Sequence, residues 1–202
     1  EGEVSHAQVT RYLAGTKKTA ADLWPTVKPL VRAIQTEAGV LIIDDSIAEK
    51  PYTDENDILC WHSDHSKDRR LKGITFLTAL YRSQGVNVPV GFHVVAKTEQ
   101  YSDPKTQKQQ RRSPVSKKAV CQEQIKQAGT PLLSFRFVLF DVWCASAATM
   151  VCIKQQQQRD FICPLKTNCT VALSRADKQQ GRYGRVDTLE LEAMKPVTVY
   201  LE

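Results

Sequence analysis

The segment VLIIDDS, residues 40–46, constrains the fold of this chain more than any other stretch. Four consecutive apolar residues without polar alternation are typical of a central strand that is covered on both faces of a sheet. The run continues into Asp44 and Asp45, although carboxylates are poor strand formers and costly to desolvate. Either the strand ends there and the acids begin a loop, or a carboxylate at the strand end holds a metal ion.

The residues before this strand, 1–39, have apolar side chains at helical spacing. Ser5 is the predicted cap of a first helix, and a second helix is expected from Thr19, with interruptions at Pro25 and Pro29. We therefore expect a short helical segment ahead of the first strand.

Strands and helices follow one another in the rest of the chain. Residues 50–70 are polar and predict an ordered loop, and β-branched and aromatic stretches on either side of SQG predict a hairpin over 71–97. A hydrophilic insertion, 97–118, leads into a helix that Ser116 caps. The later segments are an apolar strand FRFVLFD, a helix ASAATMVCIKQQQQ, an apolar strand DFICPLKT and two alternating strands around MKP.

This order predicts a mixed α/β fold, in which a sheet of parallel and antiparallel strands is flanked by helices. We expect a helical segment over 1–39, a core over 40–175 and the start of a further set of strands over 176–202. No apolar run approaches the roughly 18 residues that span a bilayer, so no membrane partner is expected.

The charge and the cysteines narrow the expected surroundings of the protein. A formal net charge of +6 and a pI of about 9.0 favour a polyanionic partner. The six cysteines include no C-x-x-C pair, and several lie in apolar stretches. We expect free thiols that act as small core residues in a reducing cytosol.

A further carboxylate, Asp141, ends the apolar strand FRFVLFD. If this strand is the parallel neighbour of the first, the two strand ends lie about 4.8 Å apart. Paired carboxylates suit hard cations such as Mg²⁺, and two ions about 3.5–4 Å apart stabilise the attacking and leaving oxygens of an in-line phosphoryl displacement. The spacing alone does not distinguish this site from the ordinary end of a strand.

Several long segments, irregular loops included, carry a family resemblance. They are LIIDDSIAEKPYTDENDILCWHSDHSKDRRLKGI, VPVGFHVVAKTEQYSDPKTQKQQRRSPVSKK, FRFVLFDVWCAS and DFICPLKTN. In this order they resemble bacterial insertion-sequence transposases of the DDE type, in the branch with a β-strand insertion. The resemblance extends over essentially the whole chain.

The resemblance implies a fold similar to ribonuclease H and a catalytic triad of two Asp and one Glu that binds two Mg²⁺, or Mn²⁺ in their place. The first Asp of the family is followed by Thr or Ser and corresponds to Asp45, with Asp44 as the alternative, because strand alternation turns only one of them toward the metals. The second corresponds to Asp141. The implied endonuclease cleaves transposon ends, and the freed 3′-hydroxyl then attacks target DNA, in a bacterial cytoplasm close to the nucleoid and with a homodimer as a further expected partner.

The chain departs from that family at the third acid. The family pattern of Tyr, two residues, Arg, three residues and Glu is not found, and Glu190 and Glu192 lie in an alternating pattern that fits the start of the β-insertion. Cys144 and Cys169 stand where the family usually has an aromatic and a basic residue. We therefore expect a C-terminally truncated transposase, with an inactive DNA-binding remnant and an unrelated metal-dependent nuclease as alternatives.

Two basic groups are the expected DNA contacts, and they would bind phosphates without regard to sequence and in a salt-sensitive manner. The basic groups are Lys67, Arg69, Arg70 and Lys72 after the first strand, and Lys105, Arg111, Arg112, Lys117 and Lys118 in the insertion.

The segment WHSDHS places His62, Asp64 and His65 close together, either as a metal cluster or as a loop that packs and hydrogen-bonds.

Overall fold

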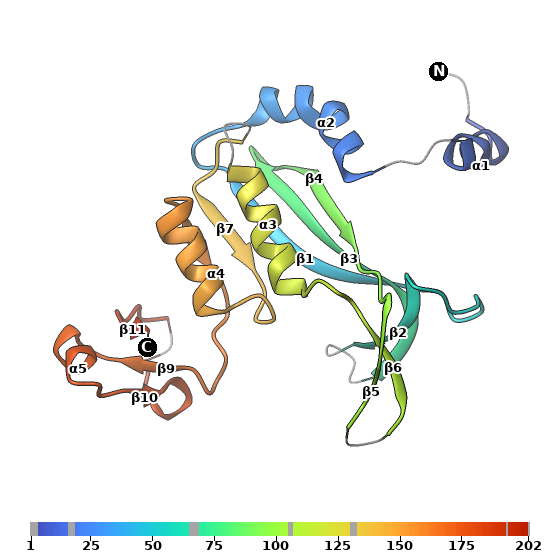
Figure 1. The fold of residues 1–202 in the computed structure, drawn as a ribbon. Helices are drawn as coiled ribbons and strands as arrows, with labels where there is room; N and C mark the ends of the chain where they lie inside the picture. The colour runs from blue at the N-terminus through green and yellow to red at the C-terminus, as the bar shows by residue number, and fades with distance from the viewer. Residues whose placement is uncertain are drawn as a thin grey trace. The chain divides into compact units, whose positions relative to one another are not determined.

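The computed structural model describes residues 4–15, 19–64, 69–104, 107–129, 133–192 and 194–201 (Figure 1). The chain divides into two compact units, Glu1–Ile162 and Cys163–Glu202, each of which is described here by itself. The first unit combines a mixed sheet with helices, which confirms the predicted α/β class. No helix among the described ranges is long and apolar enough to cross a membrane.

The helical segment contains α1 (His6–Gly15) and α2 (Ala20–Ile34). Ser5 caps α1 as predicted, because its hydroxyl accepts a hydrogen bond from the backbone of Gln8. α2 runs through both prolines, so the predicted interruptions are wrong. The prolines lie on the exposed side of the helix, where water can hydrogen-bond the carbonyls that their missing N–H groups leave free.

The central sheet has the strand order β2-β3-β1-β7-β8, and β4 pairs with the rest of β3. β1 is antiparallel to β3 and parallel to β7, and β8 continues the parallel half. The sheet is therefore mixed, with its antiparallel strands on one side of β1. The strands are β1 (Val40–Glu49), β2 (Leu59–Asp64), β3 (Arg69–Ser83), β4 (Val86–Val94), β7 (Phe137–Phe140) and β8 (Asp160–Ile162).

β1 continues past its two acids, so the explanation that they begin a loop is wrong. Asp44 lies opposite Thr78 and Asp45 opposite Leu77 in the antiparallel ladder with β3. Pairing with β7 stops earlier, where Ile43 is the partner of Phe140. The acids thus lie where β1 loses one neighbour and keeps the other, beside the turn that follows β7.

The helices of the core cover one face of the sheet. Along β3 the buried residues alternate with half-buried ones, and Leu77 on the buried face packs with Val120 of α3 (Lys117–Gly129). α4 (Ala147–Val151), which continues as the π-helix η1 (Cys152–Gln156), contacts α3 through Thr149 and Gln122, and Figure 1 shows α3 and α4 before the same face. The expectation that β1 is covered on both faces is wrong, because Ile42 on the opposite side is half-buried.

Two segments expected to be irregular form strands. The loop 50–70 contains β2, and the insertion contains a two-stranded ribbon of β5 (Glu99–Ser102) and β6 (Gln109–Arg112). The predicted hairpin of β3 and β4 is confirmed, and its turn places Gln84 and Gly85 at positive φ, as two-residue hairpin turns require.

The second unit is a small three-stranded sheet in the order β10-β9-β11. The two strands predicted around MKP are only two residues each and pair with β9 rather than with one another. The elements are β9 (Thr170–Ala172), α5 (Arg175–Gln179), β10 (Gly184–Arg185), the 3₁₀ turn η2 (Val186–Thr188) and β11 (Tyr200–Leu201).

Candidate functional site

Asp45 lies on the helix-covered face of the sheet. It shares the alternation of the buried residues Leu41 and Ile43, whereas Asp44 points to the exposed side. The side chain of Asp45 is 21% exposed and forms an ion pair with Lys117, the first residue of α3. A half-buried carboxylate is therefore neutralised by a cation from the helix that covers it.

Asp141 immediately follows β7, at the carboxyl end of the strand that runs parallel to β1. Its Oδ1 accepts a hydrogen bond of 2.6 Å from the backbone of Val142. The last paired residues of the two strands are Ile43 and Phe140, which Asp44 and Asp141 directly follow. The structure thus confirms that β7 is the parallel neighbour of β1, although β1 continues beyond its acids. Strand alternation favours Asp45 as the first candidate ligand, whereas the register favours Asp44.

Trp143 lies in the turn after Asp141, close to the lysine that pairs with Asp45. Its ring packs against the buried cluster of Leu77, Val95 and Val120. The ammonium of Lys117 lies 6.0 Å from the centre of the Trp143 ring, at the limit for a cation–π interaction. Lys117 therefore contacts Asp45 directly and lies close to the turn after Asp141.

A disulfide between Cys121 and Cys144 joins α3 to the same turn. Both cysteines are fully buried, and the bond closes a separation of 23 residues. The expectation that these two cysteines are free thiols is wrong, because the second turn of α3 lies next to the turn that follows β7. The helix that supplies Lys117 and the turn that follows Asp141 are thus covalently connected.

His62 is a buried polar residue on the same face, next to this site. It is 7% exposed, and its Nε2 lies 3.4 Å from the sulfur of Cys60. Burial, assisted by the positive charges of Lys97 and Lys117, lowers the pKa of His62 to about 4. His62 is therefore neutral at pH 7 and adds no positive charge beside Asp45.

The WHSDHS segment gives no support to a metal cluster at this position. His62 belongs to β2 and faces the core, while His65 and the side chain of Asp64 lie outside the described residues. In the part of the chain that the structure describes, no group of three His, Cys, Asp or Glu side chains is placed to hold a metal ion.

The basic residues predicted to contact DNA divide into paired and unpaired groups. Lys67 and Lys105 lie outside the described residues. Arg70, Lys72 and Lys118 form no ion pair with the residues that the structure describes. The paired ones are Arg69 with Glu49, Arg111 with Asp57 at 3.1 Å, Arg112 with Glu99 at 2.9 Å, and Lys117 with Asp45.

Glu190 and Glu192 belong to the second unit and lie in irregular structure rather than in a strand, because the chain there leaves η2 without a ladder partner. Glu192 forms an ion pair with Lys195 at 3.1 Å. The alternating pattern that predicted strands through these residues was therefore misleading.

Nothing in the sequence connects Lys117 with Asp45, which lie 72 residues apart. The sequence places Lys117 in a basic cluster, and only the packing of α3 on the sheet brings its side chain to the carboxylate. The sequence likewise carries no signal for the contact of Trp143 with this site. A Ser cap at Ser116 fixes where α3 begins, and this is the one local signal that could have placed Lys117 at the end of a helix.

Comparison with known proteins adds a distant likeness. No family model matches the chain, and no curated protein matches it. Among solved structures, the chain is similar to the piggyBac transposase in a cryo-EM structure of its synaptic complex with hairpin DNA, at 14% sequence identity and a TM-score of 0.42. The match covers 78% of this chain and 26% of that one, so this chain spans about a quarter of that protein.

Proposed function

We propose that this chain is part of a DNA transposase of the DDE type, with an RNase H-like core that cleaves and joins DNA by in-line phosphoryl transfer. The observation that carries the proposal is the position of Asp141 at the carboxyl end of β7 and of Asp45 where β1 loses its parallel pairing with that strand. Open α/β sheets place their sites at such strand ends. The resemblance of the loops around both acids supplies the reaction class.

The donor chemistry at this site suits a hard divalent cation. Carboxylate oxygens are the preferred ligands of Mg²⁺ and Mn²⁺, and Asp45 already pairs with one cation, the ammonium of Lys117. Asp45 and Asp141 would hold the ion, with Asp44 as the alternative to Asp45. A bound Mg²⁺ would stabilise the charge that develops on phosphate oxygens during displacement.

Lys117 has two roles in this proposal. Without a divalent ion it neutralises Asp45, and it thereby removes the repulsion between nearby carboxylates. With an ion held by Asp45, the Lys117 ammonium would be free to bind a DNA phosphate beside the Trp143 ring. Trp143 and the disulfide fix the turn that positions Asp141.

The unpaired basic residues are the proposed DNA contacts. Arg70 and Lys118 are exposed and Lys72 is half-buried. They can bind phosphates without first breaking an ion pair, in contrast to Arg69, Arg111 and Arg112. We expect transposon-end DNA and target DNA as partners, with contacts that position the duplex rather than read its sequence.

One observation favours the second candidate, a DNA-binding remnant that does not cleave. Asp45 is occupied by Lys117, and no third acid joins it among the residues that the structure describes. Two carboxylates of which one is already neutralised bind a divalent ion weakly. This chain would then bind DNA through its basic residues without cutting it.

Nicking of DNA separates these functions. The substrate is a labelled duplex that carries the DNA flanking the coding sequence, with a scrambled duplex as the control, in Mg²⁺ and then Mn²⁺. Transposase function predicts nicking at the flanking DNA that Asp45→Asn and Asp141→Asn both abolish. Salt-sensitive binding without nicking supports the remnant, and nicking of both duplexes equally supports a general nuclease.

The DNA contacts can be tested apart from the chemistry. Replacing Arg70, Lys72 and Lys118 by Gln should lower the slope of log affinity against log salt by about 3, because each phosphate contact contributes about 0.9. The matched control replaces Arg111 and Arg112, whose ion pairs already neutralise them. A control that loses more of the slope than the test variant would contradict this assignment.

A further inference from the structure

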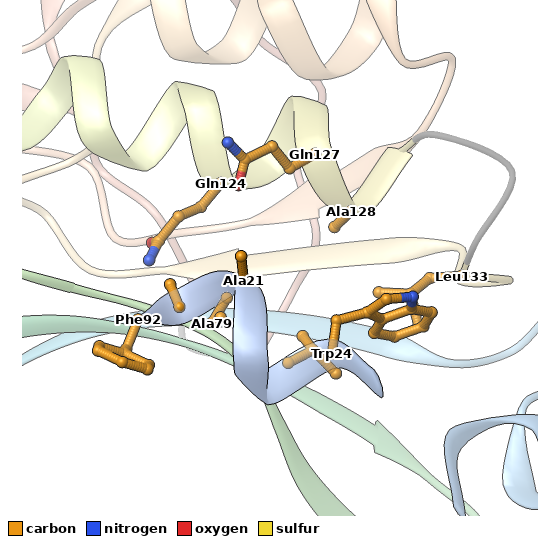
Figure 2. Close-up of a pocket in the computed structure, with 11 residues that line it drawn as sticks. Ala21, Trp24, Ala79, Phe92, Gln124, Gln127, Ala128 and Leu133 are labelled. Carbon is orange, nitrogen blue, oxygen red and sulfur yellow. The ribbon is translucent and has the colours of Figure 1, made fainter. Parts of the chain in front are cut away.

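A cavity of about 470 Å³ lies between α2, β4 and α3, away from Asp45 and Asp141 (Figure 2). In Figure 2, Gln124 and Phe92 lie on one side and Trp24 and Leu133 on the other. Its volume falls within the range of small-molecule sites. The lining residues include Trp24, Val90, Phe92, Gln124, Ala128 and Leu133.

The lining is uncharged and predominantly apolar. Small residues such as Ala21, Ala79 and Gly91 form much of the wall and leave room between the larger side chains. Water in such a space would be poorly held, because a buried water needs two to four polar partners. A neutral ligand with an apolar body fits this lining better than a charged one.

Gln124 supplies a polar group that lacks a partner. Its side chain is 7% exposed, and its Nε2 donates a hydrogen bond of 3.3 Å to the carbonyl of Leu77. Because that carbonyl can only accept, the amide nitrogen must face it, and the Oε1 is left as a buried acceptor without a partner. A buried acceptor without a hydrogen bond is destabilising, so a ligand that donates to it gains affinity.

The neighbouring Gln127 is exposed, and its Nε2 donates to Glu123 at 3.0 Å. The Gln124 oxygen, which is buried and has no partner, is the acceptor that a ligand in this cavity would satisfy. A ligand with one N–H donor on an apolar ring would satisfy this oxygen while its ring contacts Trp24 and Phe92.

We infer that this cavity binds a neutral aromatic molecule that carries a single N–H donor, with Gln124 as the acceptor that recognises it. This inference does not depend on the proposed transposase function. Offset or edge-to-face contacts with Trp24 and Phe92 stabilise an aromatic ring, and the hydrogen bond selects the donor.

Indole and 1-methylindole form a matched pair of probes, since they share the ring system and differ in the N–H. Isothermal titration calorimetry with the full chain should show that indole binds about tenfold more tightly than 1-methylindole, as expected for one buried hydrogen bond. In Gln124→Met, which keeps the side-chain length and removes the acceptor, the two affinities should become equal.

A second variant tests the location of the site without touching Gln124. Ala21 lines the cavity, so Ala21→Trp should fill it and abolish binding of both probes, whereas Ala33→Trp on the same helix, outside the cavity, should change neither. Circular dichroism confirms that each variant is folded. No binding of indole to the wild-type chain at millimolar concentration, or discrimination that persists in Gln124→Met, would overturn the inference.

Discussion

Breaking the disulfide between Cys121 and Cys144 should cost the first unit a large part of its stability. The bond constrains a separation of 23 residues in the unfolded chain, and the loop-entropy relation gives about 3 kcal/mol for a loop of that length. A domain of ordinary stability has about 5–15 kcal/mol in total. The reduced protein should therefore unfold at a clearly lower urea concentration than the oxidised one.

Urea unfolding at pH 7, with and without dithiothreitol, measures this difference. Because both cysteines are fully buried, reduction should require partial opening and proceed slowly in the native state. A Cys121→Ala, Cys144→Ala double variant should resemble the reduced protein and should not respond to the reductant. Cys152→Ala is the matched control, since Cys152 is buried but unbonded and its variant should still respond.

Thiol titration of the unreduced, unfolded protein provides the direct check. Two of the six cysteines form the bond, so four should react. Six reactive thiols, or a midpoint in urea that dithiothreitol leaves unchanged, would refute the assignment and restore the expectation of free core cysteines.

Three further changes test the site and its support. Lys117→Met should increase Mn²⁺ affinity, measured by electron paramagnetic resonance, because it removes the competing cation; equal affinity in Lys118→Met and Lys117→Met would contradict this. Between pH 6.5 and 4 only the unfolded state takes up the His62 proton, because the folded pKa is about 4, so the wild-type protein should lose about 3 kcal/mol of stability over this range. His62→Gln should abolish this loss, and free energies of unfolding in urea that fall equally with pH in both proteins would contradict it. Gly39→Ala should destabilise by roughly 1–3 kcal/mol, because its Cβ would lie 2.5 Å from the Tyr81 hydroxyl and 2.8 Å from the backbone oxygen of Ser134; an unchanged thermal midpoint would contradict this.

The sequence predicted those elements whose signals are local. The caps at Ser5 and Ser116 mark where α1 and α3 begin, and the SQG turn marks the hairpin. The sequence does not predict β2, because the polar residues on both sides of this short strand hide its apolar pattern. Hydrogen bonding to β3 nevertheless makes the segment a strand. The prediction that the two prolines interrupt α2 is wrong, because the solvent-facing side of a packed helix tolerates the hydrogen bonds that proline cannot form.

The candidate site was predictable only in its backbone. An apolar run that ends in an acid, repeated after a crossover, correctly placed β1 and β7 as parallel neighbours. Side-chain relations between distant segments have no such signal. The pairing of Lys117 with Asp45 and the disulfide both depend on how α3 packs on the sheet, which periodicity alone does not specify.

The two proposed functions therefore differ in the outcome of one competition, between a divalent ion and the ammonium of Lys117 for the carboxylate of Asp45. A carboxylate half-buried beside an ammonium is already neutralised, and a divalent ion must replace that ammonium before it can bind. Lys117 is 38% exposed, so its ammonium can turn toward solvent at modest cost. A DNA phosphate that attracts Lys117 would free Asp45 at the moment when the substrate arrives, which would make metal binding and DNA binding mutually reinforcing rather than independent.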